Sequence, residues 1–378
     1  MASSINLPEE LIIEIMSWLS PESLIQFKCV GKYWYKLVTF LLNDPSFVVK
    51  HLRNQNDSNN IFFSPSIAVS CLRIYDTPVY TYKELFALIS VPNSNQNDSV
   101  SEDMNLPIIP GEKDMSSQTI SHCNGVVCVA DYYHNIILSN PAMKNSRVLP
   151  EPGLMGRFVL QGVGFGYDSR NNDYKVVRFG RDQSIYPRAE VYSLNSDSWK
   201  EIGIDSGTDY FPSLHIDTYF NGAFYWLMSG PRFMIQYFDM SDEVFRDVTL
   251  PESLQTAKSQ WMSLGVWNDS VALFFCPGEK GTPVTVDIWV MNEECVNGPD
   301  SWKKGLTIGP FEGIDCPLGF CNEEEFVMRS ANFREVVCYY NVRTQNLRNI
   351  KVEGLDGIGC RALSYVKSLV SVQTRNEK

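Results

Sequence analysis

Residues 189–202 read AEVYSLNSDSWKEI, and the order of residue types in this stretch recurs along most of the chain. Val191–Leu194 is a short run with β-branched and aromatic residues, which predicts a strand. Asn195 and the polar residues after it are typical of a tight turn. Trp199 follows as a hydrophobic anchor in the next segment. The stretch therefore predicts two antiparallel strands that are joined by a short turn.

The same order of strand, Asn or Asp, turn and anchor occurs in four more places. They are Leu138–Asn140 with Val148 and Leu149, Tyr237–Asp239 with Phe245, Ile288–Asn292 with Trp302, and Tyr339–Asn341 with Leu347. The Asn and Asp residues at positions 140, 195, 239, 292 and 341 are 55, 44, 53 and 49 residues apart. A period of about 50 residues is typical of kelch-like propeller blades. We therefore expect an all-β, kelch-like β-propeller, with Trp199 and Trp302 packed between blades.

Glycine-containing turn signals lie between these units. Asn124-Gly125 and Asn221-Gly222 supply the positive φ that tight hairpins require. Gly162, Gly164 and Gly166 are followed by a strand pattern and not by a helix, whereas a phosphate-binding loop needs the N-terminus of a helix. This glycine run therefore predicts a hairpin.

The five units and the strand-like segments within residues 61–91 together predict about six blades. The apolar run that begins at Ala362 and continues to Val372 is expected to pair with the strands near residue 61 and to close the ring. Closure removes sheet edges that would otherwise aggregate. An incomplete or irregular propeller is the main alternative.

Residues 1–50 predict a small all-α module. Apolar residues recur at helical spacing from Leu7 to Leu19, Ser20-Pro21 ends one helix and caps the next, and Trp34 begins a further apolar face. The polar residues 51–60 predict a linker, and residues 61–378 form the β domain. The helices either cap the β domain or dock into a groove on a partner, and periodicity alone does not separate these two interpretations.

The N-terminal module resembles the F-box in the order and spacing of its residues. The resemblance implies that it binds a Skp-type adaptor and, through the adaptor, a cullin and a RING protein of a ubiquitin ligase. The matching positions, which we predict to be adaptor-binding, are Leu7, Pro8, Leu11, Ile15, Leu19, Leu24, Val30, Trp34 and Leu37.

The β domain resembles the F-box-associated domain of plant F-box proteins and is most similar to that of the S-locus F-box family. The matching strings include SHCNGVVCV, LSNPAMKNSRVLP, GFGYDSRNNDYKVVRFG and YFDMSDEVF. The resemblance implies a non-catalytic substrate receptor that directs a non-self pistil S-ribonuclease, typically a basic protein, to ubiquitination and proteasomal degradation. In this family the receptor is the pollen determinant of self-incompatibility.

Charge and composition agree with such a partner. The chain has 378 residues and a formal net charge of −12, of which residues 1–50 contribute −1. An acidic domain repels nucleic acid and favours a basic partner. No run of about 18 apolar residues is present, so we expect no membrane span. The apolar run 11–19 is not preceded by a basic region, which predicts no signal peptide, reduced thiols and a cytoplasmic or nuclear protein.

No catalytic, cofactor or metal site is predicted. His122, Cys123, Cys128 and His134 fit no zinc-ligand spacing, and the two cysteines are expected to be buried thiols within a strand. Four histidines in the whole chain show no nucleophile–base arrangement. The favoured function is a ligase receptor. A non-ligase interaction scaffold and a propeller enzyme are the alternatives.

Overall fold

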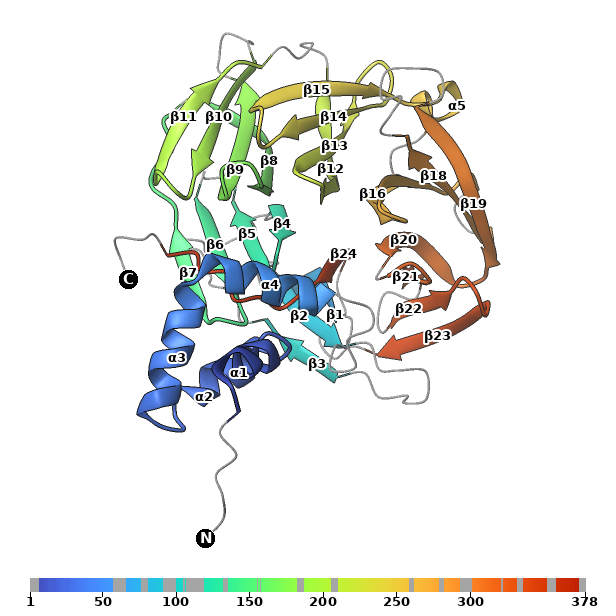
Figure 1. Cartoon of the computed structure of the whole chain (residues 1–378). Helices are drawn as coiled ribbons and strands as arrows, with labels where there is room; N and C mark the ends of the chain where they lie inside the picture. The colour runs from blue at the N-terminus through green and yellow to red at the C-terminus, as the bar shows by residue number, and fades with distance from the viewer. Residues whose placement is uncertain are drawn as a thin grey trace.

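The structure is a computed structural model. It describes residues 7–56, 66–75, 81–90, 100–104, 106, 119–131, 135–154, 156, 158–181, 187–204, 210–257, 262–278, 282–292, 301–320, 322–331, 336–351 and 358–373. Within these residues, four helices precede a ring of six four-stranded antiparallel sheets, seen along its axis in Figure 1.

The blades are numbered here in chain order, and the last strand belongs to the blade that holds the first three. Blade 1 comprises β4 (Thr119–Cys123), β5 (Val126–Ala130), β6 (Ile136–Asn140) and β7 (Asn145–Val148). Blade 2 comprises β8 (Val159–Asp168), β9 (Asp173–Arg181), β10 (Pro187–Ser193) and β11 (Ser198–Ile202), and blade 3 comprises β12 (Phe211–Phe220), β13 (Ala223–Ser229), β14 (Met234–Asp239) and β15 (Val244–Thr249). A short helix, α5 (Glu252–Gln255), follows blade 3.

Blade 4 comprises β16 (Met262–Trp267), β17 (Ser270–Phe275), β18 (Val284–Met291) and β19 (Trp302–Phe311), and blade 5 comprises β20 (Ile314–Phe320), β21 (Glu325–Ser330), β22 (Val336–Asn341) and β23 (Asn346–Lys351). Blade 6 comprises β24 (Ile358–Tyr365), β1 (Ser66–Tyr75), β2 (Thr81–Ser90) and β3 (Val100–Asp103). The prediction of an all-β propeller of about six blades is confirmed.

The ring closes in blade 6, where strands from the two ends of the β domain pair. β24 is antiparallel to β1, with Ser66 opposite Tyr365 and Ala68 opposite Leu363. The innermost strand of this blade therefore comes from the end of the chain and the other three from the start. The predicted closure by the run that begins at Ala362 is confirmed.

The repeated Asn or Asp marks the turn between the third and fourth strands of a blade. The side-chain oxygen accepts a hydrogen bond from the N–H three residues later, as in Asn140 to Met143 (3.2 Å), Asp239 to Asp242 (2.8 Å) and Asn341 to Thr344 (2.8 Å). The residue after that N–H has a positive φ, because the chain must reverse within four residues.

In blade 2 this position is held by Ser193, whose Oγ accepts from the N–H of Ser196 at 3.2 Å. Asp197 then has a φ of 52°. The predicted marker Asn195 is therefore two residues too late, since a serine hydroxyl replaces the carboxamide at the equivalent position. After Asn292 in blade 4, residues 293–300 lie outside the described residues.

The glycine run lies inside β8 and not in a turn. A Cβ at Gly164 would be 2.7 Å from the ring of Trp226, and one at Gly166 would be 2.5 Å from the ring of Tyr219. These aromatic side chains belong to blade 3 and reach the inner strand of blade 2. The glycines therefore allow close packing of the two blades. The prediction that they form the hairpin turn was wrong, because the turn follows β8 at residues 169–172.

The predicted anchors differ in their burial. Trp302 is 6% exposed and packs in the core shared by blades 3 and 4. Trp199 is only partly buried, and its Nε1 donates to the carbonyl of Pro150 at 2.8 Å, which ties blade 2 to the segment after blade 1. Val148 and Leu347 are 60% and 44% exposed, because the outermost strand of a blade turns one face to solvent.

The helical module consists of α1 (Glu9–Met16), α2 (Pro21–Phe27), α3 (Lys32–Asn43) and α4 (Pro45–Asn56). Ser20 caps α2, as predicted, by accepting from the N–H of Ser23 at 3.3 Å. The predicted linker 51–60 is wrong over residues 51–56, which complete α4. His51 is fully buried there, and its Nε2 contacts the carbonyl oxygen of Leu19 at 2.8 Å. Residues 57–60 lie outside the described residues.

Residues 366–373, which we call the closing strap, lie between the helical module and blade 1. Leu369 is 1% exposed and packs in the module core with Leu24 and Leu41. Val370 and Val372 face the other way and pack in the core of blades 1 and 2. The strap therefore contributes to both hydrophobic cores, so the module is packed on the ring.

The side chain of Asn140 holds the closing strap in place. Its Nδ2 donates to the carbonyl oxygens of Ser368 at 3.0 Å and Val370 at 2.8 Å, and the residue is fully buried. Gly125 also adjoins the strap, because a Cβ there would be 2.5 Å from the carbonyl oxygen of Val366. A buried carbonyl without a donor costs about 1–3 kcal/mol, so this amide stabilises the strap in one position.

We predict that Asn140→Ala lowers the free energy of unfolding by about 2–4 kcal/mol, because two buried carbonyl groups lose their donor. Asn341→Ala is the matched control, since Asn341 occupies the same turn position in blade 5 and its described bond is the one to Thr344. Urea unfolding followed by tryptophan fluorescence measures both variants. Equal losses in the two variants would contradict the role of the Asn140 amide at the strap.

Candidate functional site

The first candidate surface is an apolar stripe formed by α1 and by Leu7, which lies two residues before the helix begins. Leu7, Leu11 and Ile15 are 48%, 50% and 52% exposed. They are four residues apart, so they share one side of the helix. Met16, on another side, is 2% exposed and packs in the module core. The helix thus buries one set of apolar side chains and presents a second set to solvent.

Further large apolar side chains of the module are exposed beyond α1. They are Val30 (65%), Tyr33 (53%), Tyr35 (57%) and Phe40 (65%). Exposed apolar groups gathered on one small element mark an interaction surface more often than single scattered ones do. The sequence analysis missed Tyr33, Tyr35 and Phe40. Their signal was that they fall outside the helical stripe of Leu37, Val38 and Leu41, which is buried.

The nine predicted adaptor-binding residues fall into three groups. Leu7, Pro8, Leu11, Ile15 and Val30 are exposed, and Leu19 and Trp34 are half-buried. Leu24 and Leu37 are 1% and 6% exposed and lie in the module core. The last two therefore support the surface from beneath instead of forming part of it.

The ring has two different faces. In each blade the turns after the first and third strands lie at one end, and the connections after the second and fourth strands lie at the other, because antiparallel strands reverse at every turn. We call the end with the turns after the first and third strands the turn face. The helical module lies on this face, because it packs on Met143 and on the strap that begins after Tyr365, and Asn140 holds that strap.

Three polar segments that join strands, here called the recognition loops because loops on a rigid scaffold suit target recognition, are flanked by strand ends on the opposite face. Arg181 is the last residue of β9 and residues 182–184 follow it, residues 205–209 precede β12, and residues 277–280 follow β17. Residues 182–184, 205–209 and 279–280 lie outside the described residues. The strand ends that flank these segments are described, and they lie on the face of the ring away from the module.

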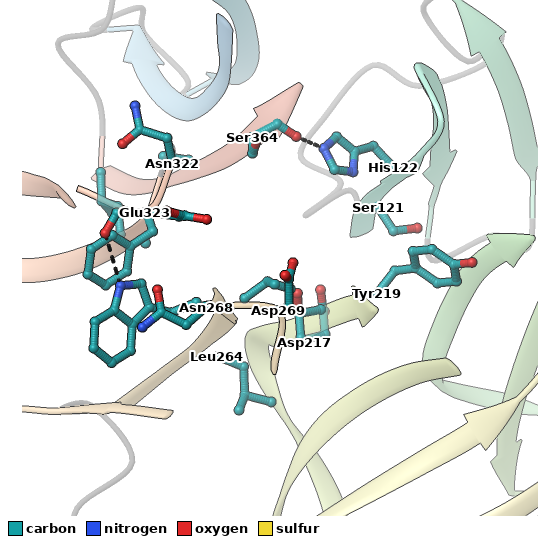
Figure 2. Close-up of a pocket in the computed structure, with 18 of the residues that line it drawn as sticks. Ser121, His122, Asp217, Tyr219, Leu264, Asn268, Asp269, Asn322, Glu323 and Ser364 are labelled. Atoms are coloured by element: carbon teal, nitrogen blue, oxygen red, sulfur yellow. Dashed lines mark hydrogen bonds between the residues drawn. The ribbon is translucent and has the colours of Figure 1, made fainter. Parts of the chain in front are cut away.

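The second candidate site is a cavity of about 240 Å³ on the axis of the ring (Figure 2). Inner strands of several blades line it, with Asp217 from β12, His122 from β4 and Ser364 from β24. Asp269 and Glu323 come from the turns after β16 and β20, so the cavity lies toward the turn face. His122 Nε2 bonds to the carbonyl oxygen of Ser364.

Burial changes the acid–base properties of the groups in and near this cavity. Burial raises the pKa of Asp217 to about 7, and it lowers the pKa of His122. Burial also raises the pKa of Cys123 and of Cys128 to about 12, so both are protonated thiols at neutral pH. The predicted burial of these two cysteines is confirmed, but they lie in two strands, Cys123 in β4 and Cys128 in β5, and not in one. His134 lies outside the described residues.

Among the residues that the structure describes, no group of three or more His, Cys, Asp and Glu side chains is placed to hold a metal ion. Within the same ranges, every helix is too short or too polar to cross a bilayer.

Comparison with known proteins places both parts of the chain in families. Residues 5–46 match an F-box-like model, and residues 74–372 match the model of the F-box associated beta propeller domain. The helical module and the ring of blades thus coincide with the two matched regions.

Three relatives from Arabidopsis thaliana illustrate the similarity. The F-box protein At3g16210 is 29% identical over 68% of this chain and 64% of its own length, and the F-box protein At3g10430 is 30% identical over 64% and 61%. The chain thus spans less than two thirds of these two relatives. The F-box/kelch-repeat protein At3g23880 is 25% identical over 98% of this chain and 97% of its own length. Since the propeller model alone covers most of the sequence, the chain belongs to the family of plant F-box proteins with an F-box associated beta propeller domain.

Proposed function

We propose that this protein is the substrate-recognition subunit of a Skp–cullin–F-box ubiquitin ligase. The observation that carries the proposal is the exposed apolar stripe of Leu7, Leu11 and Ile15 on a helical module that packs against a propeller. The module binds a Skp-type adaptor, which links it to a cullin and a RING protein. The propeller binds the protein to be ubiquitinated.

The stripe suits a helical partner because it offers aliphatic side chains at a spacing of four residues. An apolar helix face that docks into a groove binds through such anchors. Each anchor at the centre of an interface contributes roughly 1–2 kcal/mol or more when it is fully desolvated. The buried Leu24 and Leu37 keep the helices in register beneath it.

The closing strap gives the receptor a fixed geometry. Lys367 of the strap pairs with Glu22 of α2 at 2.7 Å, and Leu369 packs between the helices. A bound adaptor and a bound target are then held at a defined separation. Such positioning raises the local concentration of target lysines near the charged ubiquitin carrier, so the receptor itself needs no catalytic group.

The target in this proposal is a basic protein. The chain beyond residue 50 carries a net charge of −11, which favours a positively charged partner. The resemblance to the S-locus F-box family suggests a non-self S-ribonuclease, with a role in self-incompatibility in pollen. The proposed place of action is the cytoplasm, with the nucleus as a second compartment.

Two alternative functions predict different experimental results. A non-ligase scaffold would bind proteins through the propeller but would not co-purify with a Skp-type adaptor. A propeller enzyme would turn over a substrate. Co-purification of the full chain with an adaptor, followed by reconstitution of ubiquitination on a candidate ribonuclease, separates the ligase receptor from both.

We predict that Leu7→Ala combined with Leu11→Ala weakens adaptor binding by about 100-fold, or roughly 2.7 kcal/mol, because two exposed anchors are truncated. Val148→Ala combined with Val159→Ala is the matched control, since these aliphatic residues are 60% and 66% exposed on the propeller. Calorimetric titration with the adaptor gives both affinities. If the two double variants bind alike, the stripe is not the adaptor surface.

For the target, we predict that affinity falls as salt rises, because screening weakens attraction between exposed charges. Exchange of residues 181–184, 205–209 and 277–280 with those of a relative should change which ribonuclease is bound and leave the adaptor affinity unchanged. Binding assays on such chimaeras test this division. It would be overturned if the choice of ribonuclease followed the helical module instead.

A further inference from the structure

The axial cavity contains a carboxylate that has no protein partner in the described residues. Asp217 lies within β12, three residues before the strand ends, and no hydrogen bond or ion pair joins it to a described group. Figure 2 shows its carboxylate and that of Asp269 directed toward the middle of the cavity. By contrast, Asp168 and Glu243 nearby in the ring are both paired with Lys175.

The described groups that face Asp217 carry no compensating positive charge. Glu323 and Asp269 approach from the turns of blades 5 and 4, and neither Lys nor Arg is among the described residues that line the cavity. His122 approaches from blade 1, but burial lowers its pKa, so the imidazole is neutral. Tyr219 is the other titratable group, and its hydroxyl donates to the carbonyl of Tyr167 at 3.1 Å.

One wall of the cavity is aromatic. The rings of Trp267 and Phe320 stack with centroids 5.4 Å apart. The indole N–H of Trp267 donates to the carbonyl of Glu323 at 3.2 Å, which fixes the ring at the turn face. A cation attracted by the carboxylates would therefore lie beside an aromatic surface, an arrangement that favours a guanidinium group.

We propose that this cavity binds a basic side chain, preferably an arginine, of a partner protein that approaches the turn face. The volume of about 240 Å³ is below the roughly 300–1,000 Å³ of pockets for drug-sized ligands and suits a single side chain. The site is on the face that carries the helical module, away from the recognition loops, so it goes beyond the proposed function and is independent of it.

An unpaired carboxylate in such a place costs stability, which is a reason to expect that it serves binding. Its ionised form loses part of its hydration and gains no hydrogen bond from a described group. Groups that are kept in an unfavourable environment are concentrated at functional sites. A guanidinium ion in the cavity would supply the missing donors and favour the ionised carboxylate.

Binding can be tested with N-acetylarginine amide as the probe and N-acetylcitrulline amide as its neutral, nearly isosteric control. Calorimetric titration of the full chain should show binding of the arginine probe and none of the citrulline probe. Asp217→Asn should weaken binding by about tenfold, since the charge partner in the cavity is lost. Glu201→Gln is the matched control, because Glu201 lies on the outer strand of blade 2 in a pair with Arg188.

A citrulline affinity equal to that of arginine, or an Asp217→Asn variant that binds as well as Glu201→Gln, would overturn the proposal. Neither experiment involves an adaptor or a ribonuclease, so failure here leaves the receptor function standing. Failure of adaptor binding would likewise leave this site standing.

A melting experiment provides a second readout with a defined sign. Burial raises the pKa of Asp217 from its ordinary value of 3.8 to about 7, so the ionised form destabilises the fold increasingly as pH rises through this window. Asp217→Asn should therefore raise the melting temperature at about pH 8 and leave it unchanged at about pH 3.5. N-acetylarginine amide should stabilise the unsubstituted chain at the higher pH. An Asp217→Asn chain that melts lower at the higher pH would show that the carboxylate is structurally paired and would contradict the site.

Discussion

The hydrogen bonds from the Asn140 amide to the carbonyls of Ser368 and Val370 connect the parts of this molecule. A propeller is stable only when its first and last blades meet, and a helical module of this size cannot bury its apolar residues alone. The closing strap meets both needs with a few residues. Its alternate side chains enter the module core and the core of blade 1, while Asn140 satisfies the backbone polar groups that this double burial removes from water.

The charges of the ring have different roles according to their partners. On the turn face, acids join neighbouring blades, as in Arg147 with Asp197 at 2.6 Å and Lys200 with Glu243 at 2.9 Å. These pairs are partly exposed and each contributes little stability, but in each pair the basic side chain neutralises the charge of the acid. Asp217 lacks such a pairing to described groups. The net charge therefore describes the surface as a whole, whereas the position of each acid decides whether it joins neighbouring blades or has no partner among the described groups.

The sequence predicted the architecture better than it predicted individual roles. The repeat of strand, turn marker and anchor was sufficient to predict the blades and the closure of the ring, because each blade of a propeller has the same arrangement of strands and turns. It could not assign Asn140 and Asn341 different tasks, since both make the same local turn and only the distant strap distinguishes them. Likewise, α4 continues through polar residues such as His51 and Gln55, which are buried by contacts with α1 and the turn after it. The sequence did not predict the cavity, because the residues that line it come from different blades and are far apart along the chain.

The place of β24 in blade 6 also constrains how the protein is made. Chains emerge from the ribosome with their N-terminal residues first, and domains usually begin to fold in that order. Here β1 lacks its neighbour, and the helices lack Leu369, until residues 358–373 have been synthesised. The nascent chain therefore carries an unpaired strand edge and an open apolar core until these residues emerge. Closure of the ring and completion of the module core therefore depend on the same late segment.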